Sequence, residues 1–182
     1  MVEVIGMKKE TAAAETRYSL ETIYHRYYKN VYNYIAFRIN NHYDAEELAS
    51  DVFVKAIQSQ KRYNGKSPME AWLIGIAKNT VTDYLRKTMR RQSLPIDSII
   101  DLVSAEKQPE EVVVINEESK QLMSALTRLR DKERQIISMK FATELKHSEI
   151  AKILNISESH VGVTVHRAMG KLKRFMEVPD ER

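Results

Sequence analysis

Apolar residues recur at every third or fourth position through several long stretches of the chain, a spacing that places them on one face of a helix. The first stretch covers residues 20–35, and the second covers 45–57 and opens with a cluster of acidic residues. After a segment at 63–68 with the composition of a turn, the spacing continues from about 69 to 89. The first half of the chain is therefore predicted to form three amphipathic helices.

The second half of the chain shows the same spacing in shorter stretches. Asn155 readily takes the left-handed conformation that a tight turn between helices needs, and Ser157 is a good N-cap. The two helices on either side of this turn have the pattern of a helix-turn-helix. The predicted helices begin near Leu122 and then cover Glu133–Phe141, His147–Leu154 and Ser157–Phe175.

The last predicted helix exposes a polar and basic face of the kind that can enter the major groove of DNA. The alternative is a helical hairpin used for protein contacts, which has to explain the cations that gather toward the end of the helix. Those cations are Arg167, Lys171, Lys173 and Arg174. The whole face comprises Ser159, His160, Val163, His166, Arg167, Gly170 and Lys171.

Charge divides the 182-residue chain into three parts. Residues 1–91 carry 15 Lys and Arg against 10 Asp and Glu, 92–119 carry 1 against 7, and 120–182 carry 13 against 8. The acidic middle part holds two prolines and few aromatic residues, which predicts a linker between two basic domains. We therefore expect an all-α protein of two small helical domains, the second with four helices.

Several classes of function are disfavoured by composition. Cysteine is absent, which excludes a disulfide scaffold, thiolate zinc sites and a cysteine nucleophile. No two of the five histidines have the i, i+4 spacing that aims both rings at one metal, so we expect no metal and no cofactor. No apolar run approaches the roughly 18 to 20 residues that cross a bilayer, and the N-terminus lacks the apolar core of a signal peptide. We expect a cytoplasmic protein.

Two surfaces of the first domain have two interpretations each. The acidic start of the second helix either complements the positive end of the helix dipole or docks a basic partner. On the third helix, an aromatic, an amide and a cation share a flanking face, a mixture that suits single-stranded nucleic acid. The alternative there is that Trp72 is half-buried packing and that Arg86 pairs with Asp83 across one turn.

Three motifs in the same order resemble the extracytoplasmic-function group of the sigma-70 family of bacterial sigma factors. They are DAEELASDVF at Asp44–Phe53, AWLIGIAKNTVTDYLR at Ala71–Arg86, and EIAKILNISESHV at Glu149–Val161 followed by VHRA from Val165. The helix-turn-helix alone is shared by many regulators, but the three motifs with an acidic linker between them are highly specific.

The resemblance implies a domain organisation around the two promoter elements. Residues 18–91 would bind core RNA polymerase and the minus-ten element, and 120–182 would bind the minus-thirty-five element. Residues 92–119 would be the linker between them, and residues 1–17 form an extension to which the resemblance does not reach.

The resemblance also assigns residues to the polymerase and to the melted strand. The acidic helix would contact the coiled coil of the β′ subunit, and the loop after it would capture a flipped base. The polymerase-binding candidates are Asp44, Glu46, Glu47, Leu48, Asp51 and Phe53. The minus-ten candidates are Lys55, Tyr63, Asn64, Lys66, Ser67, Trp72, Lys78, Asn79, Asp83 and Arg86.

The recognition helix departs from the family pattern. Gly162 and Val163, followed by Thr164, stand where a basic residue and a serine are common, so the helix is less basic than usual. Gly162 also costs roughly 1 kcal/mol against Ala in a helix, so we expect it to allow a close approach of the backbone to DNA. The minus-thirty-five candidates are Ser157, Ser159, His160, Gly162, Val163, Thr164, His166, Arg167 and Lys171.

The partners that the resemblance implies are core RNA polymerase, through its β′ coiled coil and β flap, promoter DNA, and an anti-sigma factor of a class that is often membrane-anchored. We expect no small-molecule substrate and no enzymatic activity, since no convergent catalytic group is visible. The alternative is a conventional helix-turn-helix regulator that binds duplex DNA without polymerase, although the chain has no obvious dimerisation zipper.

Overall fold

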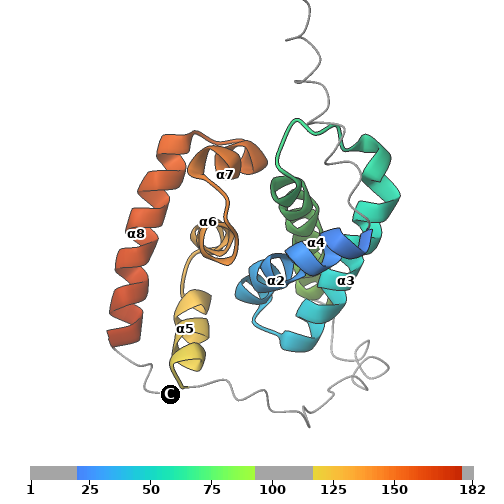
Figure 1. Cartoon of the computed structure of the whole chain (residues 1–182). Coiled ribbons are helices and arrows are strands. Elements are labelled where there is room, and N and C mark those ends of the chain that lie inside the picture. The colour runs from blue at the N-terminus through green and yellow to red at the C-terminus, as the bar shows by residue number, and fades with distance from the viewer. Residues whose placement is uncertain (1–19, 93–116, 178–182) are drawn as a thin grey trace, which may run out of the picture.

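The computed structural model describes residues 20–92 and 117–177 (Figure 1). Within these residues every regular element is a helix, which confirms the predicted fold class. The N-terminal domain contains α2 (Leu20–Ile39), α3 (His42–Ser59), the 3-10 helix η2 (Gln60–Arg62) and α4 (Met69–Gln92). The C-terminal domain contains α5 (Glu117–Thr127), α6 (Asp131–Ala142), α7 (His147–Leu154) and α8 (Glu158–Glu177). Predictions for residues 1–17 and for 93–116 of the linker lie outside the described residues.

The three long helices of the N-terminal domain bury the apolar faces that their spacing predicts. The turn between α2 and α3 uses Asn40, whose φ of 54° lies in the left-handed region that Asn tolerates. The next residue caps α3, because the Asn41 side chain accepts a hydrogen bond from the Asp44 backbone N–H at 3.2 Å. The buried face of α3 packs against both α2 and α4.

The C-terminal domain contains the predicted helix-turn-helix. α7 ends at Asn155, whose φ of 54° and ψ of 50° are left-handed, as expected. The Ser157 hydroxyl accepts a hydrogen bond from the His160 backbone N–H at 3.1 Å, so it caps α8. Ala151 is buried, on the helix that packs against α8. A small side chain at this position allows the two helices to approach closely.

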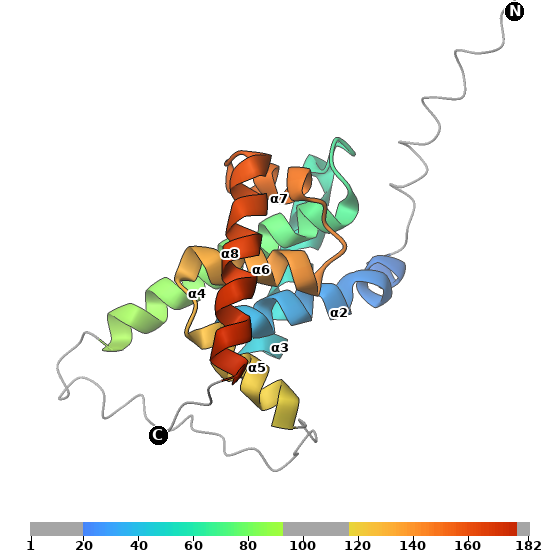
Figure 2. The ribbon, with the colours of Figure 1, turned by 90° about the vertical axis from the view of Figure 1, so that its left-hand side faces the viewer.

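The two domains pack against each other through α2 and α6 (Figures 1 and 2). In both views α6 lies between α8 and the helices of the N-terminal domain. One contiguous cluster of buried side chains runs from Tyr34 and Ile35 on α2 to Ile136 and Met139 on α6, and reaches Val161 on α8. The sequence predicts two domains, but its charge pattern gives no sign that the domains share a core.

Candidate nucleic-acid interface

A polar groove between α3 and α4 brings together two sets of candidate residues that the sequence analysis treated separately. Its volume is about 470 Å³. The acidic candidates Asp44, Glu47 and Asp51 lie on its α3 wall. The minus-ten candidates Lys55, Asp83 and Arg86 line the same groove, which we call the α3–α4 groove. Lys55 belongs to α3, one turn after Asp51, so the two sets of candidates adjoin along α3 as well as across the groove.

Hydrogen bonds tie the two walls of the α3–α4 groove together. The Tyr84 hydroxyl donates to the Asp44 carboxylate, and the Lys55 ammonium donates to the Thr80 hydroxyl at 3.0 Å. Along α4, the Arg86 guanidinium pairs with Asp83 at 3.0 Å, as the alternative interpretation of this face predicted. Both side chains of that pair are well exposed, so it is a weak restraint that a phosphate can replace.

Three of the six polymerase-binding candidates are placed differently from expectation. Leu48 and Phe53 are 9% and 7% exposed and belong to the core beneath the face, although Leu48 borders the α3–α4 groove and Phe53 borders a separate apolar pocket. The reason is that both belong to the apolar stripe of α3. Glu46 is exposed but lies outside the groove, with its carboxylate 3.4 Å from the His42 ring. The exposed acidic face of the groove is therefore formed by Glu47 and Asp51, with the half-buried Asp44 beside them.

The loop before α4, residues 63–68, is shaped by its own side chains. The Tyr63 hydroxyl donates to the Ser67 carbonyl at 2.7 Å, and the Asn64 side chain accepts from the Lys66 backbone N–H at 3.1 Å. Gly65 has a φ of 69°, where other residues are strained. The Tyr63 ring lies 5.0 Å from that of Trp72 on α4. Trp72 is half-buried against the core, as its alternative interpretation predicted.

Two other minus-ten candidates lie on α4 away from the groove walls. Asn79 is exposed, so its amide is available to a base edge, whereas Lys78 is half-buried. Asn79 belongs to the same α4 face as Asp83 and Arg86 by helical spacing. The structure thus leaves Asn79 as the exposed amide among the candidates of this helix.

Most of the recognition face of α8 is open to solvent. Ser159, His160, Val163, His166 and Arg167 are all exposed, as expected, and Thr164 is half-buried. Two residues of the predicted set are engaged elsewhere, as described next.

Lys171 and Gly162 face other parts of the C-terminal domain. The Lys171 ammonium lies 2.6 Å from the Glu133 carboxylate of α6, so this cation is already paired. A side-chain carbon at Gly162 would lie 3.8 Å from the His147 ring of α7, which is ordinary contact. Gly162 therefore borders α7, and an alanine fits there without the neighbours moving.

Glu133 links the start of α6 to α8. Its second carboxylate oxygen accepts from the Arg130 backbone N–H at 3.2 Å, which caps α6. The hydrogen bond from Lys171 holds the pKa of the Glu133 carboxyl below its usual range, although partial burial acts in the opposite direction.

Polar contacts across the domain interface surround the buried Arg38 and the half-buried Arg134. Arg38, 4% exposed, pairs with Asp131 at 2.7 Å, and the Arg134 guanidinium donates to the Phe37 carbonyl at 2.7 Å. Among the described residues, three buried side-chain atoms lack a hydrogen bond of good geometry, and all three lie here: Tyr34 Oη, Arg38 Nε and Arg134 Nη2. The Tyr34 hydroxyl nevertheless interacts with Gln135 and Arg38, and both arginines hold other hydrogen bonds.

Burial of charged and polar side chains at this interface costs free energy, which opposes the favourable packing of the apolar residues. Burial and the neighbouring Arg38 charge lower the pKa of Arg134 to about 10, and burial raises the pKa of Tyr34 to about 12. Each buried unpaired polar group costs roughly 1 to 3 kcal/mol. The interface therefore combines favourable apolar burial with a substantial polar penalty.

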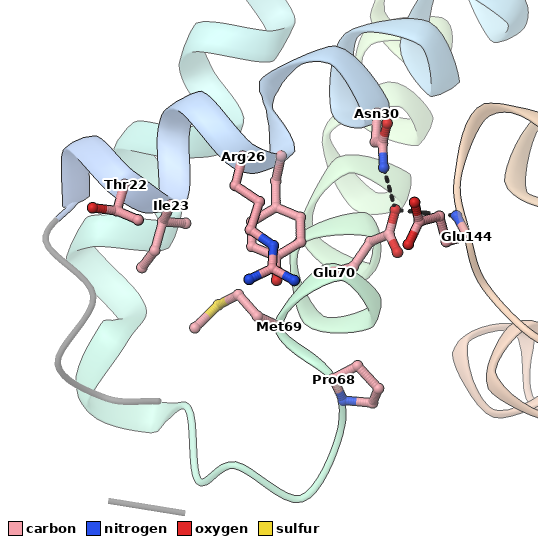
Figure 3. Close-up of a pocket in the computed structure, with 9 residues that line it drawn as sticks. Thr22, Ile23, Arg26, Asn30, Pro68, Met69, Glu70 and Glu144 are labelled. Carbon is pink, nitrogen blue, oxygen red and sulfur yellow. Dashed lines mark hydrogen bonds between the residues drawn. The ribbon is translucent and has the colours of Figure 1, made fainter. Parts of the chain in front are cut away.

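A second contact joins the domains near the 63–68 loop (Figure 3). One carboxylate oxygen of the buried Glu70 accepts from the Asn30 amide at 2.7 Å and from the Glu144 backbone N–H at 3.3 Å. Beside it lies a pocket of about 350 Å³, whose lining includes Arg26, Pro68 and Glu144 (Figure 3). The 63–68 loop and the loop before α7 thus face one small pocket.

A large apolar groove of about 790 Å³ on the C-terminal domain was missed by the sequence analysis. Exposed apolar side chains line it, including Phe141, Met169 and Met176, which are 53%, 42% and 39% exposed. Phe37 of α2 completes one side of it. Apolar residues outside the predicted stripes of α6 and α8 are the signal that could have revealed it.

The described residues contain no group of three or more His, Cys, Asp and Glu placed to hold a metal ion. None of the helices that the structure describes is both long and apolar enough to span a membrane.

Comparison with known proteins matches both domains to one family. Residues 23–91 match Sigma-70 region 2, and residues 119–172 match Sigma-70, region 4. The RNA polymerase sigma factor YlaC of Bacillus subtilis is 33% identical over 161 residues, which cover 88% of this chain and 93% of YlaC. The chain belongs to the extracytoplasmic-function sigma factors of the sigma-70 family. It is an alternative RNA polymerase sigma factor, and sigma factors are in general DNA-recognition subunits without enzymatic activity.

Other similar proteins agree with this assignment of the sigma factor. The ECF RNA polymerase sigma factor SigX of Bacillus subtilis is 26% identical and covers 88% of this chain and 84% of SigX. The fold resembles that of the sigma factor RpoE from Bartonella quintana, solved in complex with the anti-sigma factor NepR. That likeness has a TM-score of 0.70 at 21% identity and covers 89% of this sigma factor and 98% of the RpoE chain.

Proposed function

We propose that this sigma factor directs core RNA polymerase to a subset of promoters, with its N-terminal domain docking polymerase and opening the minus-ten element. The α3–α4 groove carries this proposal, since it joins an exposed acidic wall to a wall with cations and polar groups. Glu47 and Asp51 would meet a basic surface of the β′ coiled coil, where charge complementarity favours association. Lys55 and Arg86 would follow the phosphates of the displaced strand.

Strand opening is assigned to the 63–68 loop and to Asn79. A base that leaves the duplex loses stacking and pairing worth a few kcal/mol, which a shaped pocket must offset. The loop is held in shape by its internal hydrogen bonds, and the exposed Asn79 amide offers a donor and an acceptor to a base edge. The chain would act by binding alone, with no catalytic step and no cofactor.

The C-terminal domain would read the minus-thirty-five element as duplex through the exposed face of α8. His166, Arg167 and Val163 are exposed, so the first two would contact base edges or phosphates and Val163 would contact a thymine methyl. The apolar groove of this domain is a suitable surface for the β flap, because it exposes large side chains that a helix could cover.

The closed arrangement of the domains would have to open when the promoter is bound. Promoter elements two helical turns apart lie about 70 Å apart, whereas the 63–68 loop and the loop before α7 face one pocket. The 24 residues of 93–116 reach at most about 80 Å when extended, so the chain permits the separation. The incompletely bonded polar atoms around Arg38 and Arg134 would offset part of the stability that apolar burial gives the closed form, and polymerase binding would shift the population to an open one.

Opening can be measured directly because the chain has no cysteine. Arg62→Cys and Glu144→Cys place two dyes at exposed positions of the two domains, outside the candidate contact residues. We expect high energy transfer in the free protein and loss of transfer on adding core polymerase. Unchanged transfer in an active holoenzyme would contradict the opening step.

An anti-sigma factor is the proposed regulator, and the cytoplasm the proposed location. The RpoE structure contains its anti-sigma factor NepR, and a second similar structure is of CnrH with the cytosolic domain of CnrY. Since both likenesses are below 25% in sequence identity, they support the class of partner and not its identity. Any membrane anchor would belong to that partner.

Run-off transcription with bacterial core polymerase tests the proposed function. The double substitution Glu47→Lys and Asp51→Lys should abolish core binding and transcription while leaving helicity intact, because like charges would then face each other. The matched pair is Glu47→Lys and Glu46→Lys, since each single substitution makes the same charge change on the same helix and only Glu47 lines the groove. Equal loss in all variants, or core binding as tight as wild type in the double variant, would refute the docking assignment. Tight specific binding of free protein to duplex DNA would instead favour the conventional regulator.

A further inference from the structure

An apolar pocket of about 260 Å³ lies on the N-terminal domain, away from the α3–α4 groove. Its walls come from the first turn of α2, the second half of α3 and the start of α4. They include Ile23, Tyr24, Phe53, Ile57, Met69 and Trp72. We call it the Trp72 pocket.

The Trp72 pocket leaves large apolar side chains exposed to solvent. Ile57 is 48% exposed and Tyr24 is 39% exposed, while the Tyr24 and Phe53 rings lie 4.9 Å apart at its edge. Exposed apolar surface that is grouped in a concave patch marks a place where another apolar segment binds. The pocket has room for only a few aliphatic side chains, which favours a short peptide segment over a whole helix.

We propose that residues 1–7 of this same chain bind in the Trp72 pocket. Helix α2 begins at Leu20 and its first turn forms one wall of the pocket, so the point where residues 1–19 join the described chain lies beside the pocket. The 12 residues of 8–19 span about 18 Å as a helix and at most about 40 Å extended, which is enough for a return across a pocket of this size.

The composition of the N-terminal segment matches the pocket. Its apolar residues are Val2, Val4, Ile5 and Met7, and a thioether makes favourable contacts with aromatic rings such as that of Trp72. Lys8 and Lys9 follow at once, and the pocket lining includes one exposed acid, Glu21. The match to Sigma-70 region 2 begins only at residue 23, so this segment is a feature of the chain beyond the family domain.

Binding of the segment would affect the candidate DNA surface through Trp72. The Trp72 ring contacts Tyr63, which in turn bonds the carbonyl of Ser67 within the 63–68 loop. A segment that packs on Trp72 would restrain this ring and, through it, the loop.

The chain offers an intrinsic probe, because Trp72 is its only tryptophan. In the full-length protein, Ile5→Glu should shift the Trp72 emission to longer wavelength and raise its quenching by acrylamide. Ala13→Glu is the matched control, since it adds the same charge between the segment and α2 and should leave both quantities at wild-type values. Equal quenching in Ile5→Glu, Ala13→Glu and wild type would overturn the proposal.

A pair of pocket variants tests the same contact from the other side. Ile57 and Val54 are both on α3 and are 48% and 50% exposed, but only Ile57 lines the pocket. Ile57→Glu should accelerate trypsin cleavage after Lys8 and Lys9, whereas Val54→Glu should not. The double variant Ile5→Glu with Ile57→Glu should be no more sensitive than either single variant, because both remove one contact.

Two results would assign the pocket to another occupant and so overturn the proposal. Wild-type protection of Trp72 that is lost on dilution would identify a second copy of the chain. Protection that appears only on adding core polymerase would identify a partner surface. None of the supporting measurements uses polymerase or DNA, so they stand or fall separately from the proposed function.

Discussion

The candidate surfaces of the two domains differ in whether their side chains already hold hydrogen bonds within the protein. In the N-terminal domain, Lys55, Tyr63 and Asp44 each hold a hydrogen bond within the domain. In the C-terminal domain, His160, His166 and Arg167 project from α8 into solvent. The difference fits the two tasks, since a flipped base needs a pocket formed in advance, whereas duplex DNA presents its own ordered groove.

The largest effect is expected in the preformed surface. Replacing Tyr63 and Asn79 with Ala should leave holoenzyme assembly intact but reduce open-complex formation by about 100-fold, because the energy that offsets base flipping is a few kcal/mol. Permanganate footprinting of the minus-ten thymines measures this. A template melted in advance over the minus-ten element should recover part of the activity, and normal thymine reactivity on duplex DNA would mean that the two residues only pack.

A smaller effect is expected on the exposed face of α8. Arg167→Ala should weaken minus-thirty-five binding by the holoenzyme by about 1 to 3 kcal/mol, because Arg167 is free to reach a guanine or a phosphate. Lys171→Ala should change DNA affinity less, since its ammonium is bonded to Glu133. Fluorescence anisotropy over a range of salt concentrations measures both. If Lys171→Ala weakens DNA binding as much as Arg167→Ala, the pair with Glu133 breaks when DNA binds.

The smallest effect concerns the stability of the C-terminal domain in acid. The pKa of Glu133 is lowered in the folded state, so its contribution to stability is present above the pKa of the unfolded chain and is lost as pH falls through the folded-state pKa. Glu133→Gln should cost about 1 kcal/mol near neutral pH and flatten the acid side of the stability curve. Urea unfolding at several pH values measures this. A constant difference between variant and wild type across the acid range would contradict it.

Local sequence rules predicted the helices well because the helix ends carry their own signals. Asn155 and Ser157 form the turn and the cap that their side-chain chemistry favours. The family resemblance, by contrast, proposes Leu48 and Phe53 as polymerase contacts, although the apolar stripe of α3 already assigns them to the core.

Contacts between residues far apart in the chain could not be predicted from the sequence. Arg38 of α2 is buried against α6 and pairs with Asp131, 93 residues later. Pairings at that separation depend on how two domains dock, which helical periodicity does not encode. The α3–α4 groove was not predicted for the same reason, since its walls come from two different helices.

The core that both domains share affects how long the protein resists proteolysis. Because one cluster of buried side chains spans both domains, the closed chain should unfold in a single cooperative transition and should resist proteolysis as one unit. Domains of about 60 to 75 residues bury little surface alone and are marginally stable. Separation of the domains would expose Ile136 and Met139 of α6. A chain that leaves polymerase with its domains apart would therefore be susceptible to proteolysis until the two domains pack together again.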